Sequence, residues 1–187
     1  MLEAIQLTKA FKGQTVLSGF SARLEKGGHY CLMGASGSGK TTLINILLGL
    51  MKPDSGAVRR APDLKMSAVF QEDRLLEQLT AAANIALVSK ASGAQIEKLL
   101  LQLGIPAESL PQPVSAYSGG MKRRVALARA LLAEYDVLFL DEPYKGLDEE
   151  TRSAVMAIVR EYTQGKTVLL ITHDKTETDG YTPLTLK

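Results

Sequence analysis

The amino-acid sequence predicts an α/β protein built on a mostly parallel sheet. Two short runs in its second half, VLFLDEP and KTVLLITHD, are apolar on both faces, as strands are when both sides of a sheet are covered. A segment with helical spacing, DEETRSAVMAIVREYT, lies between these two runs. Strands that alternate with helices in this way are typical of a parallel sheet with helices packed against it.

The first seventy residues add further strands and one helix. AIQLTKAF and TVLSGFSARL have the β-branched, alternating character of strands, and HYCLMG is a short apolar run that ends in glycine. The helix TTLINILLGL follows and is expected to run to Gly49 and Pro53, where KPDSG supplies a turn. Two more strands are expected at GAVRR and KMSAVF.

Residues 73–134 differ from the rest of the chain. TAAANIALVS and AQIEKLLLQLG have helical periodicity, and IPAESLPQP is a connection broken by prolines. The 187 residues are enough for one domain with a sizeable core. We therefore expect a single domain, 1–187, in which residues 1–72 and 135–187 form the core and residues 73–134 form an inserted helical subdomain.

Composition argues against several classes of protein. The 22 Lys and Arg nearly balance the 20 Asp and Glu, and a net charge of +2 is too small to predict nucleic acid as a partner. The single cysteine, Cys31, excludes a disulfide framework. The first residues, MLEAIQLTKAFKG, lack the apolar stretch of a signal peptide, and no run approaches the length of a membrane span. We expect a cytoplasmic protein that acts on membranes only through partners.

The segment GASGSGKTT matches the phosphate-binding pattern G-x-x-x-x-G-K-[ST], and it lies between a predicted strand and a predicted helix. Glycines let the backbone N–H groups surround phosphate oxygens, the lysine would neutralise the β and γ phosphates, and the hydroxyl of Thr41 would bind Mg²⁺. The predicted nucleotide site consists of Gly34, Ala35, Ser36, Gly37, Ser38, Gly39, Lys40, Thr41 and Thr42.

Polar residues at the ends of two other predicted strands extend this site. Asp141 ends the strand VLFLD and is placed to hold Mg²⁺, directly or through water, while Glu142 is the candidate general base for an attacking water. His173 follows the strand VLLIT, where a neutral imidazole can contact a γ-phosphate. Ligands bind at the carboxyl ends of strands in open α/β sheets. The alternative interpretation is a pair of solvated acids and a surface histidine.

A second glycine turn precedes a helix in YSGGMKRRVALARALL. Glycine costs about 1 kcal/mol relative to alanine inside a helix, so the pair requires a reason. A turn that opens a helix leaves backbone N–H groups at the positive end of the helix dipole, where a phosphate can bind. The basic residues 122–124 either assist that phosphate or pair with groups of their own domain.

With these motifs in place, the chain resembles the ATP-binding subunits of ATP-binding cassette (ABC) transporters over nearly all of its length, most closely those of nitrate, sulfonate and taurine importers. GASGSGKTT corresponds to the Walker A loop, VFQED to the Q-loop with Gln71, SGG at Ser118–Gly120 to the signature motif and VLFLDE to the Walker B strand. THD carries the switch histidine, GLD with Asp148 is the D-loop, and Phe11 matches the aromatic residue that stacks on adenine.

This resemblance implies a P-loop NTPase core of the ABC ATPase type, with an N-terminal antiparallel β region and an inserted helical subdomain. It also implies ATP hydrolysis with Mg²⁺, and two sets of residues follow. The implied catalytic residues are Glu142, His173, Gln71 and Lys40, and the implied metal-binding residues are Thr41, Gln71 and Asp141.

The resemblance further implies a dimer of two such chains, expected to be identical, that pack head to tail. Each ATP would then lie between the Walker A loop of one chain and Ser118, Gly119 and Gly120 of the other, which explains the second glycine turn. The implied partners are integral membrane subunits and an extracytoplasmic solute-binding protein. The implied location is the cytoplasmic face of the cell membrane.

Three positions depart from the family's pattern. Tyr117, Met121 and Lys145 stand where leucine, glutamine and serine are usual, and the lysine could alter communication between the two sites. The sequence disfavours two other functions. Cassette proteins of DNA repair need a long coiled coil and those of translation need a second cassette, neither of which is present. A P-loop kinase would not require the Ser-Gly-Gly turn together with Glu142 and His173.

The segment EDRLLEQLT after Gln71 is a candidate docking site for a short helix of a membrane subunit. Leu75, Leu76 and Leu79 offer apolar anchors at i, i+1 and i+4. The alternative is that these leucines belong to the core of the helical subdomain.

Overall fold

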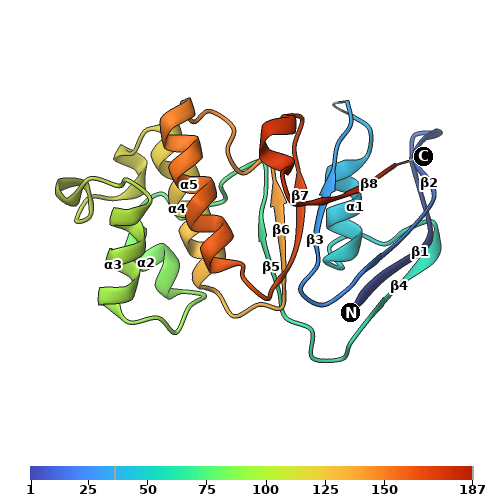
Figure 1. Ribbon diagram of the computed structural model, residues 1–187, viewed down its shortest axis with the longest axis horizontal. Coiled ribbons are helices and arrows are strands. Elements are labelled where there is room, and N and C mark those ends of the chain that lie inside the picture. The colour runs from blue at the N-terminus through green and yellow to red at the C-terminus, as the bar shows by residue number, and fades with distance from the viewer. Residues whose placement is uncertain (36, 187) are drawn as a thin grey trace. The chain divides into compact units, whose positions relative to one another are not determined.

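The computed structural model describes residues 1–35 and 37–186, which fall into two compact units (Figure 1). The predicted α/β class, with a parallel sheet and an antiparallel N-terminal sheet, is confirmed. The expected boundaries of the helical subdomain stay a prediction. Unit 1 consists of residues 1–66, 135–141 and 165–187, and unit 2 consists of residues 67–134 and 142–164.

An antiparallel sheet of three strands forms the first part of unit 1. Strands β1 (Leu2–Phe11), β2 (Gln14–Leu24) and β4 (Ser55–Arg60) lie in the order β2-β1-β4. β1 and β2 are joined by Lys12 and Gly13, which both have positive φ, at 47° and 83°. Two-residue hairpin turns of this kind match the right-handed twist of the strands, so the turn fixes the pairing of β1 with β2.

A parallel sheet forms the second part of unit 1. The strands of this sheet that lie entirely in unit 1 are β3 (His29–Leu32), β6 (Val137–Asp141), β7 (Thr167–Ile171) and β8 (Thr182–Leu184), in the order β6-β7-β3-β8. Every residue of β6 and β7 is buried, as the continuous apolar runs predicted. Helix α1 (Lys40–Leu47) follows β3 and lies beside it in Figure 1.

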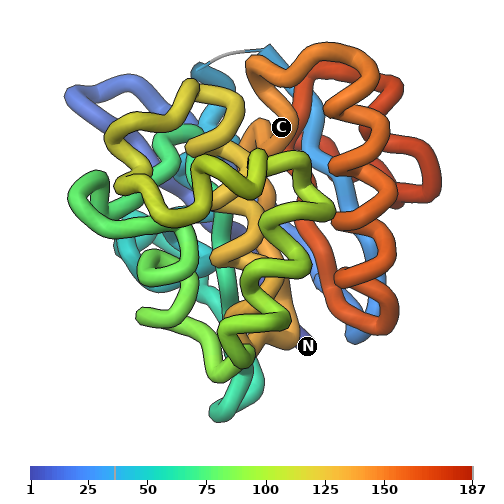
Figure 2. Tube along the Cα trace, turned by 90° about the vertical axis from the view of Figure 1, so that its left-hand side faces the viewer, coloured from blue at the N-terminus to red at the C-terminus, as the bar shows by residue number. Residues whose placement is uncertain are grey.

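Unit 2 is mainly helical, and its central element is α4 (Gly119–Leu132), which packs against three other helices (Figure 2). Nearly every residue from Val125 to Leu131 is buried, as expected for a helix surrounded by others. The other elements are β5 (Met66–Val69), α2 (Ala81–Ala86), α3 (Gly93–Gln102), η1 (Ala107–Ser109), η2 (Val114–Ala116) and α5 (Glu149–Tyr162). The proline-broken connection, residues 105–113, contains one 3₁₀ helix, η1, and a second, η2, follows directly after it.

Among the described residues, no helix combines the length and the apolar character that crossing a membrane requires.

Candidate nucleotide site

The parallel sheet of unit 1 brings the carboxyl ends of three strands to one level. Asp141, the last residue of β6, pairs with Ile171 of β7, and Leu32 of β3 pairs with the same residue from the other side. The glycine-rich loop begins two residues after Leu32, and His173 lies two residues after Ile171. The predicted phosphate loop, carboxylate and histidine therefore all follow the same edge of the sheet, where ligands bind in such folds.

Backbone geometry explains the glycines of the phosphate loop. Gly39 has a φ of 91° and precedes α1, and a Cβ on it would lie 2.4 Å from the carbonyl oxygen of Val16. Gly37 has a φ of 80°, and a Cβ on Gly34 would lie 3.0 Å from the Ser38 hydroxyl. A side chain at these positions would strain or block the loop. Ser36 lies outside the described residues.

The Lys40 ammonium lies inside this loop. Its Nζ donates hydrogen bonds to the carbonyl oxygens of Gly34 and Ala35, both at 2.7 Å, and to the Ser38 hydroxyl at 3.2 Å. Lys40 is almost fully buried. The loop thus surrounds a positive charge with backbone groups, and that charge is placed to bind the phosphates of a nucleotide.

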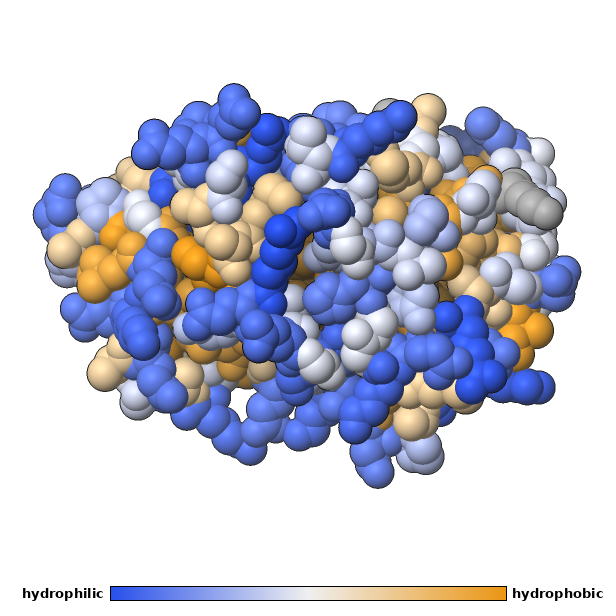
Figure 3. All heavy atoms as spheres, viewed as in Figure 1, coloured by the Kyte–Doolittle hydropathy of each residue, from blue (hydrophilic) through white to orange (hydrophobic). Residues whose placement is uncertain are grey.

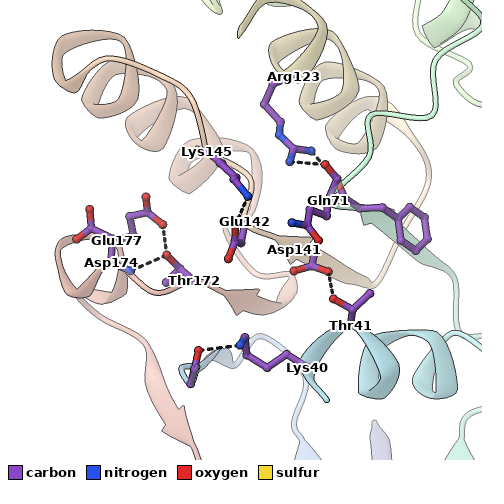
Figure 4. A network of polar contacts seen from close by, with 12 residues as sticks. Lys40, Thr41, Gln71, Arg123, Asp141, Glu142, Lys145, Thr172, Asp174 and Glu177 are labelled. Carbon is purple, nitrogen blue, oxygen red and sulfur yellow. Dashed lines mark hydrogen bonds and ion pairs between the residues drawn. The ribbon is translucent and has the colours of Figure 1, made fainter. Parts of the chain in front are cut away.

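Thr41 and Asp141 supply a pair of oxygen ligands. The Thr41 hydroxyl donates a 2.7 Å hydrogen bond to Oδ2 of Asp141, which is 3% exposed (Figure 4). The described residues contain no cluster of three or more His, Cys, Asp or Glu side chains that could bind a metal alone. Mg²⁺ is usually bound through one or two carboxylates together with substrate phosphates, so this donor set fits it. Thr41 and Asp141 would hold the ion, which would neutralise phosphate charge.

A hydrogen-bonded turn supports the segment around His173. The Thr172 hydroxyl donates to the buried carboxylate of Glu177 and accepts from the backbone N–H of Asp174 (Figure 4). The Asp174 carboxylate in turn accepts from the N–H of Thr176 in the 3₁₀ helix η3 (Lys175–Thr178). His173 is exposed on this braced turn. No sequence motif indicates the Thr172–Glu177 pair.

Phe11 ends β1, and its side chain is 43% exposed. The Lys9 ammonium lies 5.6 Å from the centre of the ring, and Lys9 also pairs with Asp54 at 2.6 Å. Much of the ring surface therefore faces solvent, which leaves it open to stacking on a planar base.

Glu142, which belongs to unit 2, has an unusual backbone conformation. Its φ is 48°, a region that residues other than glycine rarely occupy and that costs about 1–3 kcal/mol. One carboxylate oxygen of Glu142 lies 3.4 Å from the Lys145 ammonium (Figure 4). Such outliers concentrate at functional sites, and the sequence alone did not predict this one. Lys145, a departure from the family's pattern, therefore pairs with the candidate general base.

The second glycine turn begins α4. Ser118 is the N-cap, and its hydroxyl accepts a hydrogen bond from the N–H of Met121 at 3.3 Å. Gly119 and Gly120 are the first two residues of the helix and have no positive φ. A Cβ on Gly119 would meet nothing within 4 Å, and one on Gly120 would make an ordinary 3.5 Å contact with Leu147. Neither glycine is required by the backbone or by packing within this chain.

Tyr117 precedes this turn and is buried. Its hydroxyl donates a 2.8 Å hydrogen bond to the carbonyl oxygen of Ser109, and burial raises the pKa of the phenol. A tyrosine in place of leucine thus anchors the start of the turn to the 3₁₀ helix η1.

Asp148, the D-loop aspartate, caps α5 by accepting from the N–H of Thr151 at 2.9 Å, a contact that lowers the pKa of Asp148.

The basic residues after the turn pair within their own unit, which favours the second of the two interpretations above. Lys122 forms an ion pair with Glu77 at 2.7 Å. Arg124 donates to the carbonyl oxygens of Leu103 and Gly104 at the end of α3. Arg123 donates to two backbone carbonyls near the start of the Q-loop segment.

The predicted site residues are thus divided between the two units, and their roles remain predictions. Those in unit 1 are Phe11, Gly34, Ala35, Gly37, Ser38, Gly39, Lys40, Thr41, Thr42, Asp141 and His173. Those in unit 2 are Gln71, Ser118, Gly119, Gly120, Glu142 and Asp148.

Comparison with known proteins agrees with this geometry. A family model described as ABC transporter matches residues 17–145. The taurine import ATP-binding protein TauB of Pseudomonas aeruginosa is 38% identical over 94% of this chain and 73% of its own length. The aliphatic sulfonates import ATP-binding protein SsuB 1 of Pseudomonas fluorescens is 40% identical over 94% of this chain and 68% of its own length.

Solved structures lead to the same family. The dimeric bacterial ABC transporter cassette MJ0796 superposes with a TM-score of 0.88 and 28% identity, over 100% of this chain and 94% of that one. A dimeric post-hydrolysis state of the same cassette, bound to ADP and Pi, gives a TM-score of 0.87 and 26% identity. The resemblance inferred from the motifs is therefore confirmed. The chain belongs to the ABC transporter family and is an ATPase subunit that binds ATP with Mg²⁺ and hydrolyses it.

Proposed function

We propose that this ATPase drives import of an organosulfonate through integral membrane subunits, to which it binds on the cytoplasmic face of the membrane. The proposal is supported by relatives named as taurine and aliphatic sulfonates import proteins. A relative named for Fe(3+) ions import, from Pectobacterium atrosepticum, is 34% identical. All of these relatives are named as import proteins, but the solutes in their names differ. They therefore support import more strongly than they support an organosulfonate as the solute. An extracytoplasmic solute-binding protein is part of the proposed system.

Within the proposed homodimer, each ATP is bound by the Lys40 loop of one chain and by Ser118–Gly120 of the other. This arrangement is supported by Gly119, because a glycine that its own chain does not require leaves space for another molecule at a helix N-terminus. Glu142 acts as the general base. His173 and Gln71 contact the γ-phosphate and the attacking water, and Gln71 also approaches Mg²⁺.

The observation that carries the membrane partner is an exposed apolar surface on unit 2. Leu76, Leu87 and Val88 are 53%, 62% and 51% exposed, and apolar side chains gather over the helical unit in Figure 3. Exposed apolar residues near one another are typical of binding surfaces. Leu75 and Leu79 are only half-buried, so they are not fully committed to the core. The segment 72–80 is therefore the proposed docking site for a short membrane-subunit helix.

Cross-linking tests this docking site. A cysteine at Gln78, which is exposed, carries a photoactivatable cross-linker in a Cys31→Ala background, because Cys31 is buried and otherwise free. The matched control places the cysteine at Lys26, an exposed residue before β3 in unit 1. We expect capture of an integral membrane protein from Gln78 and not from Lys26. Capture of soluble proteins alone from Gln78 would contradict the docking site.

The solute is tested by uptake. Cells that express the Lys40→Ala variant in place of the parent chain should lose energised uptake of taurine or of short alkanesulfonates, because the phosphate loop loses its charge. Uptake of an unrelated amino acid is the control. If neither sulfonate is affected, the solute belongs to another class, and the membrane proteins captured from Gln78 would then identify the system.

A further inference from the structure

Residues 70–77 of unit 2 lie along α4 and are bound to it by basic side chains. The guanidinium of Arg123 donates to the carbonyl oxygen of Phe70 at 2.6 Å and to that of Gln71 at 2.9 Å. Figure 4 shows this guanidinium directed at Gln71. The side chain of Arg123 is 6% exposed, and its Nη1 lies 3.0 Å from Oδ1 of Asp73. This last contact is an ion pair without hydrogen-bond geometry.

Arg129, less than two turns further along α4, continues the same pattern. It donates to the carbonyl oxygen of Arg74 at 2.7 Å and to that of Asp73 at 2.9 Å. Two arginines of one helix thus bind four carbonyls within residues 70–74. Backbone carbonyls of an irregular segment must find partners outside regular secondary structure, and here α4 supplies them.

Two of the following residues are also bound by side chains of neighbouring helices. The N–H and the carbonyl of Leu76 both bind the side-chain amide of Asn84, which lies in α2 and is 1% exposed. Lys122 of α4 pairs with Glu77. The proposed docking segment therefore shares its hydrogen bonds with α2 and α4 over most of its length.

We propose that Arg123 is a positioning residue for ATP hydrolysis, which binds the Q-loop backbone to α4 so that Gln71 and Ser118–Gly120 move as one piece. Ser118 caps the helix that carries Arg123, five residues earlier. A helix transmits displacement along its axis because its own hydrogen bonds hold it rigid. A membrane subunit that shifts the docking segment would therefore shift the signature turn. The transmission of a shift from a membrane subunit rests on the proposed function. The contact of Arg123 with the Q-loop backbone does not.

The chemistry of arginine suits this role. Its planar guanidinium presents several N–H groups in a fixed fork that can bind two adjacent carbonyls at once, which a lysine ammonium does with less directional control. The charge is compensated by Asp73. Burial raises the pKa of Asp73, and the nearby charges of Arg123, Lys122 and Arg129 oppose that shift. Removal of Arg123 leaves two carbonyls without their donor and Asp73 without its nearest cation.

Kinetics of the isolated chain provide the first test. The variants are Arg123→Met and Arg123→Lys, and the control is Arg124→Lys, which removes a half-buried guanidinium of the same helix that binds the end of α3. In Arg123→Met we expect kcat to fall about tenfold with KM for ATP within about twofold, because a catalytic group is misplaced while the phosphate loop stays intact. Arg123→Lys should lower kcat about threefold. Arg124→Lys should lower Tm with little change in kcat.

A distance measurement provides a readout that loss of stability alone would not change. Spin labels at Glu72 and Glu97, which are exposed, report the position of the Q-loop relative to α3 in a Cys31→Ala background. The distribution of distances should widen in Arg123→Met and stay narrow in Arg124→Lys. Arg123→Lys, which keeps the charge beside Asp73, serves both measurements should Arg123→Met fail to fold.

An unchanged distribution, an unchanged kcat, or equal losses of kcat in the Arg123 and Arg124 variants would each overturn the positioning role. The experiment uses no membrane protein. Failure here would therefore leave the docking proposal intact, and failure of the cross-linking experiment would leave this one intact.

Discussion

Two glycine turns precede helices in this protein, and they differ in what requires the glycines. In the loop before α1, Gly39 is fixed by the chain itself, since its φ is 91° and a Cβ would overlap the Val16 carbonyl. In the turn before α4, Gly119 has an ordinary helical position and open space around it. The glycine of the first turn is required by the fold of its own chain, whereas Gly119 in the second turn is not.

This difference between the two turns indicates their functions. A residue that is unfavourable in a helix and unnecessary for packing points to a constraint from another molecule. For the α4 turn, the proposed constraint is the ATP bound to the partner chain. Substitutions in the two turns should therefore separate folding from nucleotide binding.

In the Glu142→Gln variant, ATP should bind to both turns without being hydrolysed. Binding by the two turns can then be measured separately from turnover. We expect kcat to fall by about 10²- to 10⁴-fold, the usual contribution of a general base, with ATP binding retained. Steady-state hydrolysis and ATP-dependent dimer formation on gel filtration are the measurements. A variant that hydrolyses ATP at nearly the parent rate would assign the base to another residue, with His173 the next candidate.

Gly39→Ala should damage both the fold and the site. The positive φ and the overlap with Val16 force the loop to move, and misplacement of this order costs about 100-fold in the rate of ATP hydrolysis. Gly37→Ala is the control, because Gly37 also has a positive φ but a Cβ there meets nothing within 4 Å. ATP affinity and Tm should fall further in Gly39→Ala. Equal effects would mean that strain in φ, and not the overlap, determines the loop.

Mixed dimers test whether the two turns serve the same ATP from different chains. Lys40→Ala disables one turn, and Gly119→Asp places a carboxylate where it repels the γ-phosphate. Each homodimer should fail to trap ATP, while a mixed dimer contains one site with an intact loop and an intact signature. We expect trapping at half of the sites in mixed dimers. If parent chains trap ATP and proven mixed dimers do not, both turns act within one chain.

Gly119→Ala should separate folding from binding. Alanine favours the helix, so the free energy of unfolding should rise by at most about 1 kcal/mol. Trapping of ATP in the Glu142→Gln background should fall about tenfold, which equals about 1.4 kcal/mol. Gly93→Ala is the matched control, because Gly93 is also the first residue of a helix and also has open space around it. The same loss of trapping in both variants would contradict a binding role for Gly119.

Ser118→Ala should have the smallest effect. Loss of an N-cap hydroxyl costs about 1 kcal/mol in the free energy of unfolding. Ser92, the N-cap of α3, provides the control, since its hydroxyl binds the N–H of Gln95 in a capping box. Urea unfolding should give similar losses for the two variants, and only Ser118→Ala should also weaken ATP trapping. Equal trapping of ATP in the Ser118→Ala and Ser92→Ala variants would mean that the Ser118 hydroxyl has no role beyond capping its helix.

Much of the fold was predictable from local pattern. The continuous apolar runs gave β6 and β7, because strands buried on both faces leave no polar positions, and the glycine-rich motif located the turn before α1. The length of α2 was less predictable. TAAANIALVS has helical spacing throughout, yet the helix ends at Ala86, since Leu87 and Val88 are exposed and gain nothing from packing.

The sequence located those candidate site residues that belong to known motifs. It did not reveal the contacts that side chains make with backbone carbonyls. Lys40, Thr41 and Asp141 belong to motifs with known spacing, and the Thr41–Asp141 hydrogen bond joins the two motifs as expected of a magnesium site. The contacts of Arg123 with the Q-loop have no sequence signature. Every residue has a carbonyl, so nothing in the sequence shows which carbonyls an arginine will reach.

The backbone of Glu142 has a consequence for how this protein can change. Its φ of 48° suits glycine, so the chain gives up stability to keep a carboxylate at this position. Laboratory selection for heat resistance alone would therefore favour Gly at residue 142, and by the proposed role of Glu142 the resulting protein would bind ATP without hydrolysing it. If the proposal for Glu142 holds, thermal stability and turnover are opposed at this residue, and selection for both properties would be needed to preserve the glutamate.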